Sequence, residues 1–348
     1  MLVLLAVWYG ASGLHNGFTR SSLGPFIGDD DALPAAVVTA SFLQLAVSGF
    51  CAGVALFRRG VSANGEMRLA QTWLLGLLHY LTTVVTNAAY AGATVAVAQT
   101  IKAVEPLFVL VLSWVFMSKR LPTNLALTEL CAVLLLCCGV VLLVKPPSDE
   151  GPSQGDAAFA NAVWLGLASN LLNGLRAILF KVASSKSTVG AMAVSHTMNV
   201  ASVLLSIPPF FFYSICSPSL VSHTLSGAGM SLSPFVLVSF VAGACLFIYN
   251  QASFWVLSFI APTSHSVLKA LKRPVIVFGC ILLVPFLGPQ LQGATPAMVA
   301  MGLLLLFGGA GMQAYVAIKQ AELQAPSSVA EAVELRAIKV GGDNSEKE

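Results

Sequence analysis

The chain has 348 residues, of which 57% are hydrophobic and only 9% are charged, and its net charge is +3. A soluble domain carries about 25% charged residues, because it must present a polar surface to water. The composition therefore excludes a soluble globule of this size, and the outer surface must meet lipid. Only helices and closed barrels span a membrane. Barrel strands have about 10 residues, whereas the apolar runs here approach the roughly 20 residues of a spanning helix. We therefore expect an all-α membrane protein.

The apolar runs predict ten transmembrane helices. In chain order they cover residues 2–20, 34–57, 70–90, 92–117, 123–144, 159–182, 188–213, 233–258, 263–287 and 295–318. No basic, Ser-rich segment precedes the first run, so either the first helix serves as the insertion signal or a leader has been trimmed. The polar segment 320–348 is expected to form a short helix and a disordered tail.

Charged residues in the loops predict the orientation. Short loops on the cytosolic side are rich in lysine and arginine. The basic residues in or next to loops on the side of the two termini are Arg58, Arg59, Arg68, Lys119, Arg120, Lys181, Lys186 and Lys319. The opposite side carries Asp29, Asp30, Asp31, Asp149, Glu150 and Asp156, with Arg20 and Lys145 as the main basic exceptions. Both termini are therefore expected to face the cytosol, which agrees with an even number of helices.

The two halves of the chain repeat each other weakly. Residues Ala11–Gly17 of the first helix match Ala168–Gly174 of the sixth, and Ile101–Pro106 of the fourth match Leu268–Pro274 of the ninth. The fifth and tenth helices each carry a Leu-rich run that ends in glycine. Three matches in the same order predict two repeats, residues 1–145 and 159–319, joined by the loop 146–158 and followed by the tail 320–348. An odd number of helices per repeat inverts the second copy. We therefore expect a 5+5 inverted-repeat transporter fold with its substrate site near the midplane.

Several charged side chains lie within the predicted helices. The cations are Lys102, Arg176, Lys269, Lys272 and Arg273, and the anions are Glu105 and Glu129. A lysine or arginine at the centre of a spanning helix costs about 3 kcal/mol, so it persists only when it is paired or lines a wet cavity. The excess of cations would be neutralised by a bound anion. The adjacent Lys272 and Arg273 suit a phosphate dianion, because arginine offers a bidentate fork and lysine a compact charge.

Other partners for these cations stay open. Lys102 and Glu105 are three residues apart and could form an ion pair within one helix. Arg176 could extend its side chain to the membrane surface. Lys269 could pair with Glu129 or face a loop. Helical threonines such as Thr83 and Thr86 can bond their own backbone, and Tyr249 could be an interfacial aromatic residue.

No pattern in the sequence indicates catalysis. The five histidines lack the spacing of metal ligands, and there is no phosphate-binding glycine loop and no nucleophile elbow. We expect no catalytic residues, no metal, no cofactor and no nucleic-acid partner, and therefore no enzyme.

The sequence resembles the triose-phosphate translocator family of the drug/metabolite transporter superfamily. The resemblance covers essentially the whole chain, and its most specific words are Thr100–Pro106, Tyr249–Gln251, Ala261-Pro262 with His265, and Leu271–Arg273. The family exchanges phosphorylated sugars and acids for inorganic phosphate, mostly across plastid envelopes. The resemblance therefore implies an antiporter of phosphorylated C3 compounds or related sugar phosphates in a plastid envelope.

The resemblance also implies roles for individual residues. It implies phosphate binding by Lys102, Lys272 and Arg273. Thr86 and Tyr249 would add hydroxyl contacts, and Arg176 matches a family arginine of the sixth helix. The sequence departs from the family at Thr83, where a histidine is frequent, and at Lys269, where an asparagine is common. Both would lie near the part of the substrate that carries no phosphate.

Two other functions are compatible with parts of the sequence. A nucleotide-sugar antiporter of the Golgi or endoplasmic reticulum would keep the fold, but it would need a larger pocket and would exchange its cargo for nucleotide monophosphate. A membrane scaffold or receptor without transport would give the repeat and the buried cations no role.

Overall fold

The computed structural model describes most of the membrane-embedded chain. The described residues are 2–27, 32–58, 69–92, 98, 101–102, 104–116, 123–143, 155–186, 190–216, 232–269, 271–272, 297–298, 300–316 and 318–319. Arg273, most of the predicted loop 146–158 and the tail 320–348 lie outside this part.

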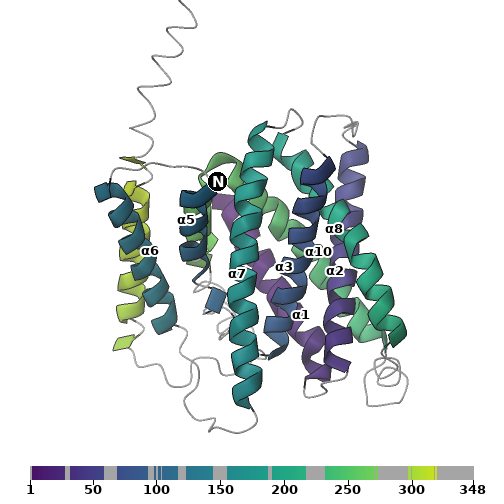
Figure 1. Ribbon diagram of the computed structural model, residues 1–348. Coiled ribbons are helices and arrows are strands. Elements are labelled where there is room, and N and C mark those ends of the chain that lie inside the picture. The colour runs from purple at the N-terminus through teal and green to yellow at the C-terminus, as the bar shows by residue number, and fades with distance from the viewer. Residues whose placement is uncertain are drawn as a thin grey trace, which may run out of the picture.

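The described chain is almost entirely helical (Figure 1). Its named helices are α1 (Leu2–Leu23), α2 (Ala32–Arg58), α3 (Leu69–Gly92), α5 (Glu105–Phe116), α6 (Thr123–Leu143), α7 (Gly155–Lys186), α8 (Gly190–Cys216) and α10 (Leu232–Phe259). Residues 262–269 and Ala300–Val316 are also helical. Four helices have the length and composition to cross a membrane: Ala32–Arg58, Ala160–Ser185, Gly190–Tyr213 and Pro234–Phe259. The expectation of a helical membrane protein is confirmed.

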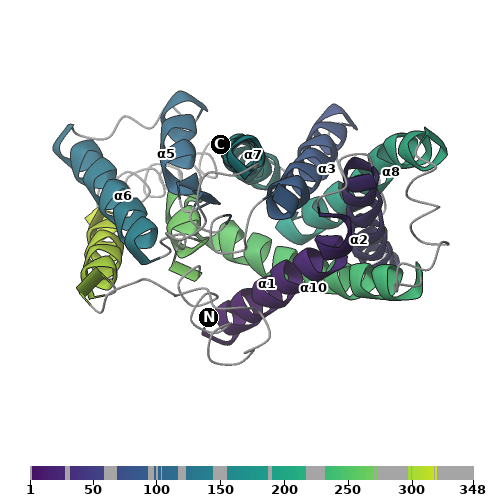
Figure 2. The same ribbon diagram turned by 90° about the horizontal axis from the view of Figure 1, so that it is seen from below.

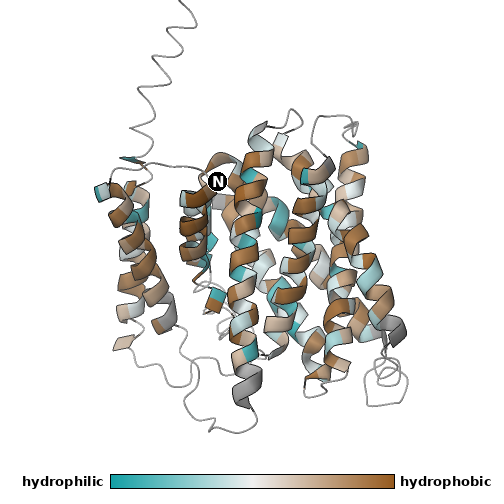
Figure 3. Cartoon of the chain, in the orientation of Figure 1, coloured by the Kyte–Doolittle hydropathy of each residue, from teal (hydrophilic) through white to brown (hydrophobic). Residues whose placement is uncertain are grey.

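The distribution of side chains fits a lipid surround. Large apolar side chains cover the outside, where Phe57 is 88% exposed and Trp164 is 71% exposed, and the outer faces of the helices are largely hydrophobic (Figure 3). Polar residues such as His79 and Asn199 are instead fully buried. Lipid tails would leave these polar groups without partners, so they gather where helices meet.

The helices pack in a regular set of pairs. α1 lies along α10, α3 lies along α7, and α2 lies along α8. α2 also contacts α10, and α8 also contacts α3. Seen from below, α7 lies between α3 and α5, and α6 and the helix Ala300–Val316 lie beyond α5 (Figure 2).

Glycines bring α6 and the helix Ala300–Val316 together. A Cβ added at Gly139 would lie 2.6 Å from the backbone nitrogen of Leu306, and one added at Gly309 would lie 2.6 Å from the carbonyl oxygen of Ala132. The two backbones touch here because small residues remove the side chains that would hold them apart. The glycines that follow the Leu-rich runs of the fifth and tenth predicted helices therefore lie at the contact between these two helices.

The fourth predicted helix is not the single element expected over 92–117. Residues 101 and 102 are helical, Val104 lies in a turn, and α5 begins only at Glu105. The turn is held by bonds of the tighter i→i+3 type, from the N–H of Val104 to the carbonyl of Ile101 and from Leu107 to Val104. Pro106 follows as the second residue of α5, where its missing N–H leaves no gap in the bonding. The prediction of one continuous helix is therefore wrong in this region.

The sixth predicted helix is longer than expected. The sequence predicts residues 159–182, whereas α7 covers Gly155–Lys186 and begins inside the segment predicted as a loop. Polar residues at both ends of α7 continue the helix beyond its apolar run. The sequence prediction follows the apolar run alone and is therefore too short.

Candidate functional site

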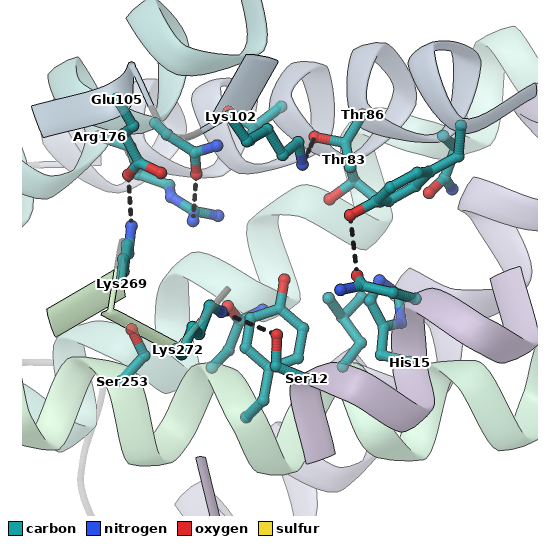
Figure 4. A pocket seen from close by; sticks show the side chains of 18 residues that line it. Ser12, His15, Thr83, Thr86, Lys102, Glu105, Arg176, Ser253, Lys269 and Lys272 are labelled. Carbon is teal, nitrogen blue, oxygen red and sulfur yellow. Dashed lines mark hydrogen bonds and ion pairs between the residues drawn. The ribbon is translucent and has the colours of Figure 1, made fainter. Parts of the chain in front are cut away.

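A buried cavity of about 60 Å³ lies among α1, α3, α7, α10 and the two segments around residues 102 and 269. A cavity of 10–15 Å³ is enough for one water molecule, so this one has room for a small ion. Its wall is largely polar, and Figure 4 shows lysine side chains entering it from opposite sides. Three of the cations predicted to contact substrate, Lys102, Lys269 and Lys272, and the predicted Thr83, Thr86, Arg176 and Tyr249 all line it.

Lys102 reaches the cavity from the helical residues 101 and 102, which precede the turn at Val104. Its ammonium donates a hydrogen bond of 3.0 Å to the hydroxyl of Thr86, which is 2.7 Å from the hydroxyl of Ser169 on α7. The ammonium also lies 5.0 Å from the centre of the Tyr90 ring, within the range of a cation–π attraction. The side chain is 9% exposed, so hydroxyls and an aromatic face replace much of its hydration.

Lys272 enters from the ninth predicted helix. Its ammonium donates a hydrogen bond of 2.7 Å to the hydroxyl of Ser12 on α1. The rings of Trp8 and Tyr249 lie 5.5 and 5.3 Å from it. Lys102 and Lys272 are therefore held in the same way, by a serine or threonine hydroxyl and by aromatic faces. Arg273, predicted beside Lys272, lies outside the described residues.

Lys269 forms an ion pair with Glu105, with 2.9 Å between its ammonium nitrogen and the Glu105 carboxylate. This pair joins residues that are 164 positions apart. The pairing considered for Lys269 with Glu129 is thus not the contact that the structure describes, and Glu129 instead accepts a hydrogen bond from Gln313. For Lys102, the described hydrogen bond goes to Thr86, and the described ion pair of Glu105 is the one with Lys269.

Arg176 is held inside the protein by a chain of hydrogen bonds. One guanidinium nitrogen donates to Nδ1 of His79, and the other donates to the side-chain oxygen of Asn173 at 2.9 Å. The opposite nitrogen of His79 then donates to Asn199, which also accepts a hydrogen bond from Ser48. Arg176 is 6% exposed, so its guanidinium lines the cavity and does not extend to the membrane surface.

The two remaining predicted residues, Thr83 and Tyr249, differ in the contacts of their side chains. The hydroxyl of Thr83 donates to the carbonyl of His79 in its own helix at 2.8 Å, as helical threonines commonly do. Tyr249 lies beside the His15 ring, with 5.3 Å between ring centres, and faces the cavity. Thr83 thus already uses its proton, whereas Tyr249 is an element of the wall and not an interfacial aromatic residue.

The charges in the wall are unequal. Among the described residues that line the cavity, Glu105 supplies one carboxylate against four cations, which are Lys102, Arg176, Lys269 and Lys272. α5 begins at Glu105, a residue of the cavity wall, so the positive end of its helix dipole lies next to the cavity. Taking cations out of water is costly unless an anion balances them. The arrangement is thus suited to hold a small anion of two or three negative charges.

Several cavity residues were not predicted to be functional from the sequence, among them Ser12, Asn16 and Tyr90. The repeat carried a signal for two of them, because Ser12 and Asn16 hold the same places in the repeated word as Ser169 and Asn173. Tyr90 lies four residues after Thr86 and therefore on the same face of α3. Its hydroxyl donates to Asn16 at 3.0 Å. No group of three or more metal-ligating side chains occurs in the part of the chain that the structure describes.

Comparison with known proteins points in the same direction. The family model of the Triose-phosphate Transporter family matches residues 1–294. The Arabidopsis thaliana phosphoenolpyruvate/phosphate translocator 2 of the chloroplast is 30% identical over 60% of this chain and 52% of its own length. Translocator 1 of that plant is 26% identical over 80% of this chain and 64% of its own. The Brassica oleracea triose phosphate/phosphate translocator of non-green plastids is 27% identical, over 80% and 65%. The chain thus spans between half and two thirds of the length of these relatives.

A solved structure has a similar fold. It is titled only "Crystal structure of protein", it is 16% identical in sequence, and its TM-score is 0.56. The match covers 92% of this chain and 99% of the other. At this identity the likeness concerns the arrangement of helices alone.

Proposed function

Because this chain belongs to the Triose-phosphate Transporter family, we propose that it is an antiporter that exchanges phosphorylated three-carbon compounds or related sugar phosphates for inorganic phosphate. The three-carbon candidates are triose phosphate, 3-phosphoglycerate and phosphoenolpyruvate. The relatives are named translocators of phosphate together with triose phosphate or phosphoenolpyruvate, and none of these names is that of an enzyme. At an identity of 30% or less, the names of the relatives do not determine which of these compounds this chain carries. That selectivity depends on the residues of its own cavity.

The observation that carries this proposal is the position of Lys102 and Lys272. Two lysines from separate helices lie in one buried cavity, and each donates to a hydroxyl of a further helix. Like charges repel at short range in a site with little water, and a phosphate between them would turn this repulsion into two attractions. We assign phosphate binding to Lys102, Lys272 and the adjacent Arg273, with Thr86 and Tyr249 as hydroxyl donors. Arg176 and Lys269 would contact the rest of the substrate.

The packing of the helices supports two five-helix repeats, residues 1–145 and 159–319. In ten spans of this kind α7, α8 and α10 would correspond to α1, α2 and α3. The pair α1–α10 then becomes α7–α3, and the pair α2–α10 becomes α8–α3, and all four pairs are in contact. An inverted repeat of this kind would let the cavity open to each side of the membrane in turn.

The same correspondence accounts for the excess of positive charge in the cavity. With Lys102 matched to Lys269, Glu105 corresponds to Lys272. Exchange of the two repeats would therefore convert the ion pair Glu105–Lys269 into a pair of two lysines, Lys272 and Lys102. Glu105 supplies the negative charge of the first pair, whereas the second pair has Lys272 at the corresponding position. A phosphate group would supply the negative charge that this second pair needs.

This charge arrangement leads to strict exchange. With the cavity empty, closing it would strip water from cations that repel each other, and this costs several kcal/mol. A phosphate or phosphate ester neutralises them and makes the closed state accessible. Only the loaded protein would then cross between its two open states, so phosphate leaves only when another phosphorylated anion enters.

We base the proposed location on the family and on the charges of the loops. The curated relatives are named as chloroplastic, and we assign this chain to a plastid envelope, with both termini on the cytosolic side. No observation on the cavity favours the nucleotide-sugar antiporter or a scaffold without transport.

Counter-exchange in proteoliposomes tests the proposal. Vesicles that contain the purified protein are loaded with radioactive phosphate, and release is followed after external addition of each candidate anion. We expect release with phosphate and with at least one three-carbon phosphate, and none in buffer without a counter-anion. Release that needs no counter-anion, or release only with nucleotide monophosphates, would contradict the proposal.

A further inference from the structure

One end of the cavity has its own arrangement of charges. The ion pair between Lys269 and Glu105 lies there, and Figure 4 shows Arg176 next to Glu105. Lys102 and Thr86 lie further along the same wall, away from this end. Glu105 is 2% exposed and Lys269 is 9% exposed, so both charges interact with little water between them.

At this end a single carboxylate serves two cations. Lys269 bonds to Glu105 at 2.9 Å, and the attraction of Glu105 also reaches Arg176. Arg176 is fixed by His79 and Asn173, which are neutral when they accept its hydrogen bonds. Among the described residues, this end therefore carries two positive charges, on Lys269 and Arg176, and one negative charge, on Glu105. A phosphate bound at Lys102 and Lys272 would leave that excess unchanged.

We infer that Lys269 and Arg176 form a second anion subsite, which receives the carboxylate of a substrate whose phosphate lies at Lys102 and Lys272. This inference rests on the proposed function. Glu105 occupies the subsite when the substrate has no carboxylate, and a bound carboxylate shares or displaces it at Lys269. The protein thus selects phosphorylated carboxylic acids over phosphorylated carbonyl compounds of the same carbon number.

Dihydroxyacetone phosphate and 3-phosphoglycerate are suitable probes, because both have three carbons and one phosphate. A phosphate ester has its second pKa near 6, so at about pH 8 both phosphates are dianions and only the second probe carries a carboxylate. Both apparent KM values are measured in phosphate-loaded proteoliposomes. The acid-to-ketone ratio is the apparent KM for the carboxylic acid probe divided by the apparent KM for dihydroxyacetone phosphate. Loss of folded protein cancels in this ratio.

Two variants should move the acid-to-ketone ratio in opposite directions. Lys269→Gln removes the ammonium that binds the carboxylate, and we expect the ratio to rise about tenfold or more. Glu105→Gln removes the internal competitor, and we expect the ratio to fall about threefold or more. If Lys269 and Glu105 only hold the helices together, both substitutions break the same ion pair and should shift the ratio alike. Such a common shift, or a change below twofold in both variants, overturns the inference.

Lys181→Gln is the matched control. Lys181 lies on α7, outside the cavity, and donates to the carbonyl groups of Leu257 and Ser258. The substitution removes the same charge from the same kind of residue, and we expect the acid-to-ketone ratio to stay within twofold of the unmodified protein. A large change in this control would also overturn the assignment of selectivity to Lys269.

The test separates the two proposals. If the unmodified protein exchanges neither probe for phosphate, the proposed function itself fails. If it exchanges them and the two variants do not diverge, the function stands and the carboxylate subsite is rejected.

Discussion

The ammonium group of Lys272 donates a hydrogen bond of 2.7 Å to the hydroxyl of Ser12, which lies 260 residues earlier in the chain. On the opposite wall Lys102 donates to Thr86, whose hydroxyl lies 2.7 Å from that of Ser169. Ser12 and Ser169 occupy the same place in the repeated word of the first and sixth predicted helices. Lys272 is thus oriented by a hydroxyl of α1, and Lys102 by a pair of neighbouring hydroxyls on α3 and α7.

Loss of the Ser12 hydroxyl should weaken phosphate binding. A hydrogen bond to a charged group contributes about 1.5–3 kcal/mol, and Ser12→Ala leaves the Lys272 ammonium less well oriented. We expect the apparent KM for phosphate in proteoliposome exchange to rise about tenfold. Ser22→Ala is the control, because Ser22 is equally buried in α1 but bonds only locally, to the carbonyl of Thr19. An unchanged KM in Ser12→Ala would show that the lysine needs no such support.

The contact between α6 and the helix Ala300–Val316 should tolerate no side chain at Gly139. A Cβ there meets backbone atoms of Gly302 and Leu306 at 2.6–2.7 Å, and overpacking of this kind costs about 1–3 kcal/mol. We expect Gly139→Val to lower the thermal unfolding temperature in detergent by several degrees. Gly308→Ala, where no atom lies within 4 Å of the added Cβ, should leave it nearly unchanged. Equal behaviour of the two variants would contradict the described packing.

Asn199 should be needed for the position of Arg176. Its side-chain oxygen serves Ser48 and His79, and its amide donates to the carbonyl of Ser195. Asn199→Ala leaves these buried groups without that partner, at about 1–3 kcal/mol for each unsatisfied group. We expect a loss of thermal stability together with a raised KM for phosphate esters. The exposed Asn124→Ala, at the start of α6, should cost about 1 kcal/mol at most, with no effect on KM.

Much of this arrangement could be predicted from the sequence, because lipid permits few solutions. Long apolar runs predict helices directly, and charges within those runs must be paired or enter a cavity. Lys102, Arg176, Lys269 and Lys272 could therefore be identified as cavity residues from their positions in those runs. The glycines that follow the Leu-rich runs of the fifth and tenth predicted helices were used only as a match between the two halves, and the structure places Gly139 and Gly309 at the contact between those helices.

The partners within the cavity could not be predicted in the same way. Whether Glu105 pairs with the lysine three residues before it or with Lys269 depends on how distant helices are oriented, and spacing along one helix does not contain that information. The break before α5 was also missed, since apolar composition continues through Val104 while the backbone turns. Polar helix ends were missed for the converse reason, because α7 continues beyond its apolar run.

The most direct test of the central claim is phosphate counter-exchange by Lys102→Gln and Lys272→Gln in proteoliposomes loaded with radioactive phosphate. Each substitution removes one of the two charges that would hold the phosphate, with Lys181→Gln as the control for the loss of a partly buried lysine elsewhere. We predict that exchange falls at least about 100-fold in both cavity variants while their thermal unfolding remains cooperative, and that the control exchanges normally. Exchange within a few-fold of the unmodified protein in both cavity variants would contradict phosphate binding between these two lysines.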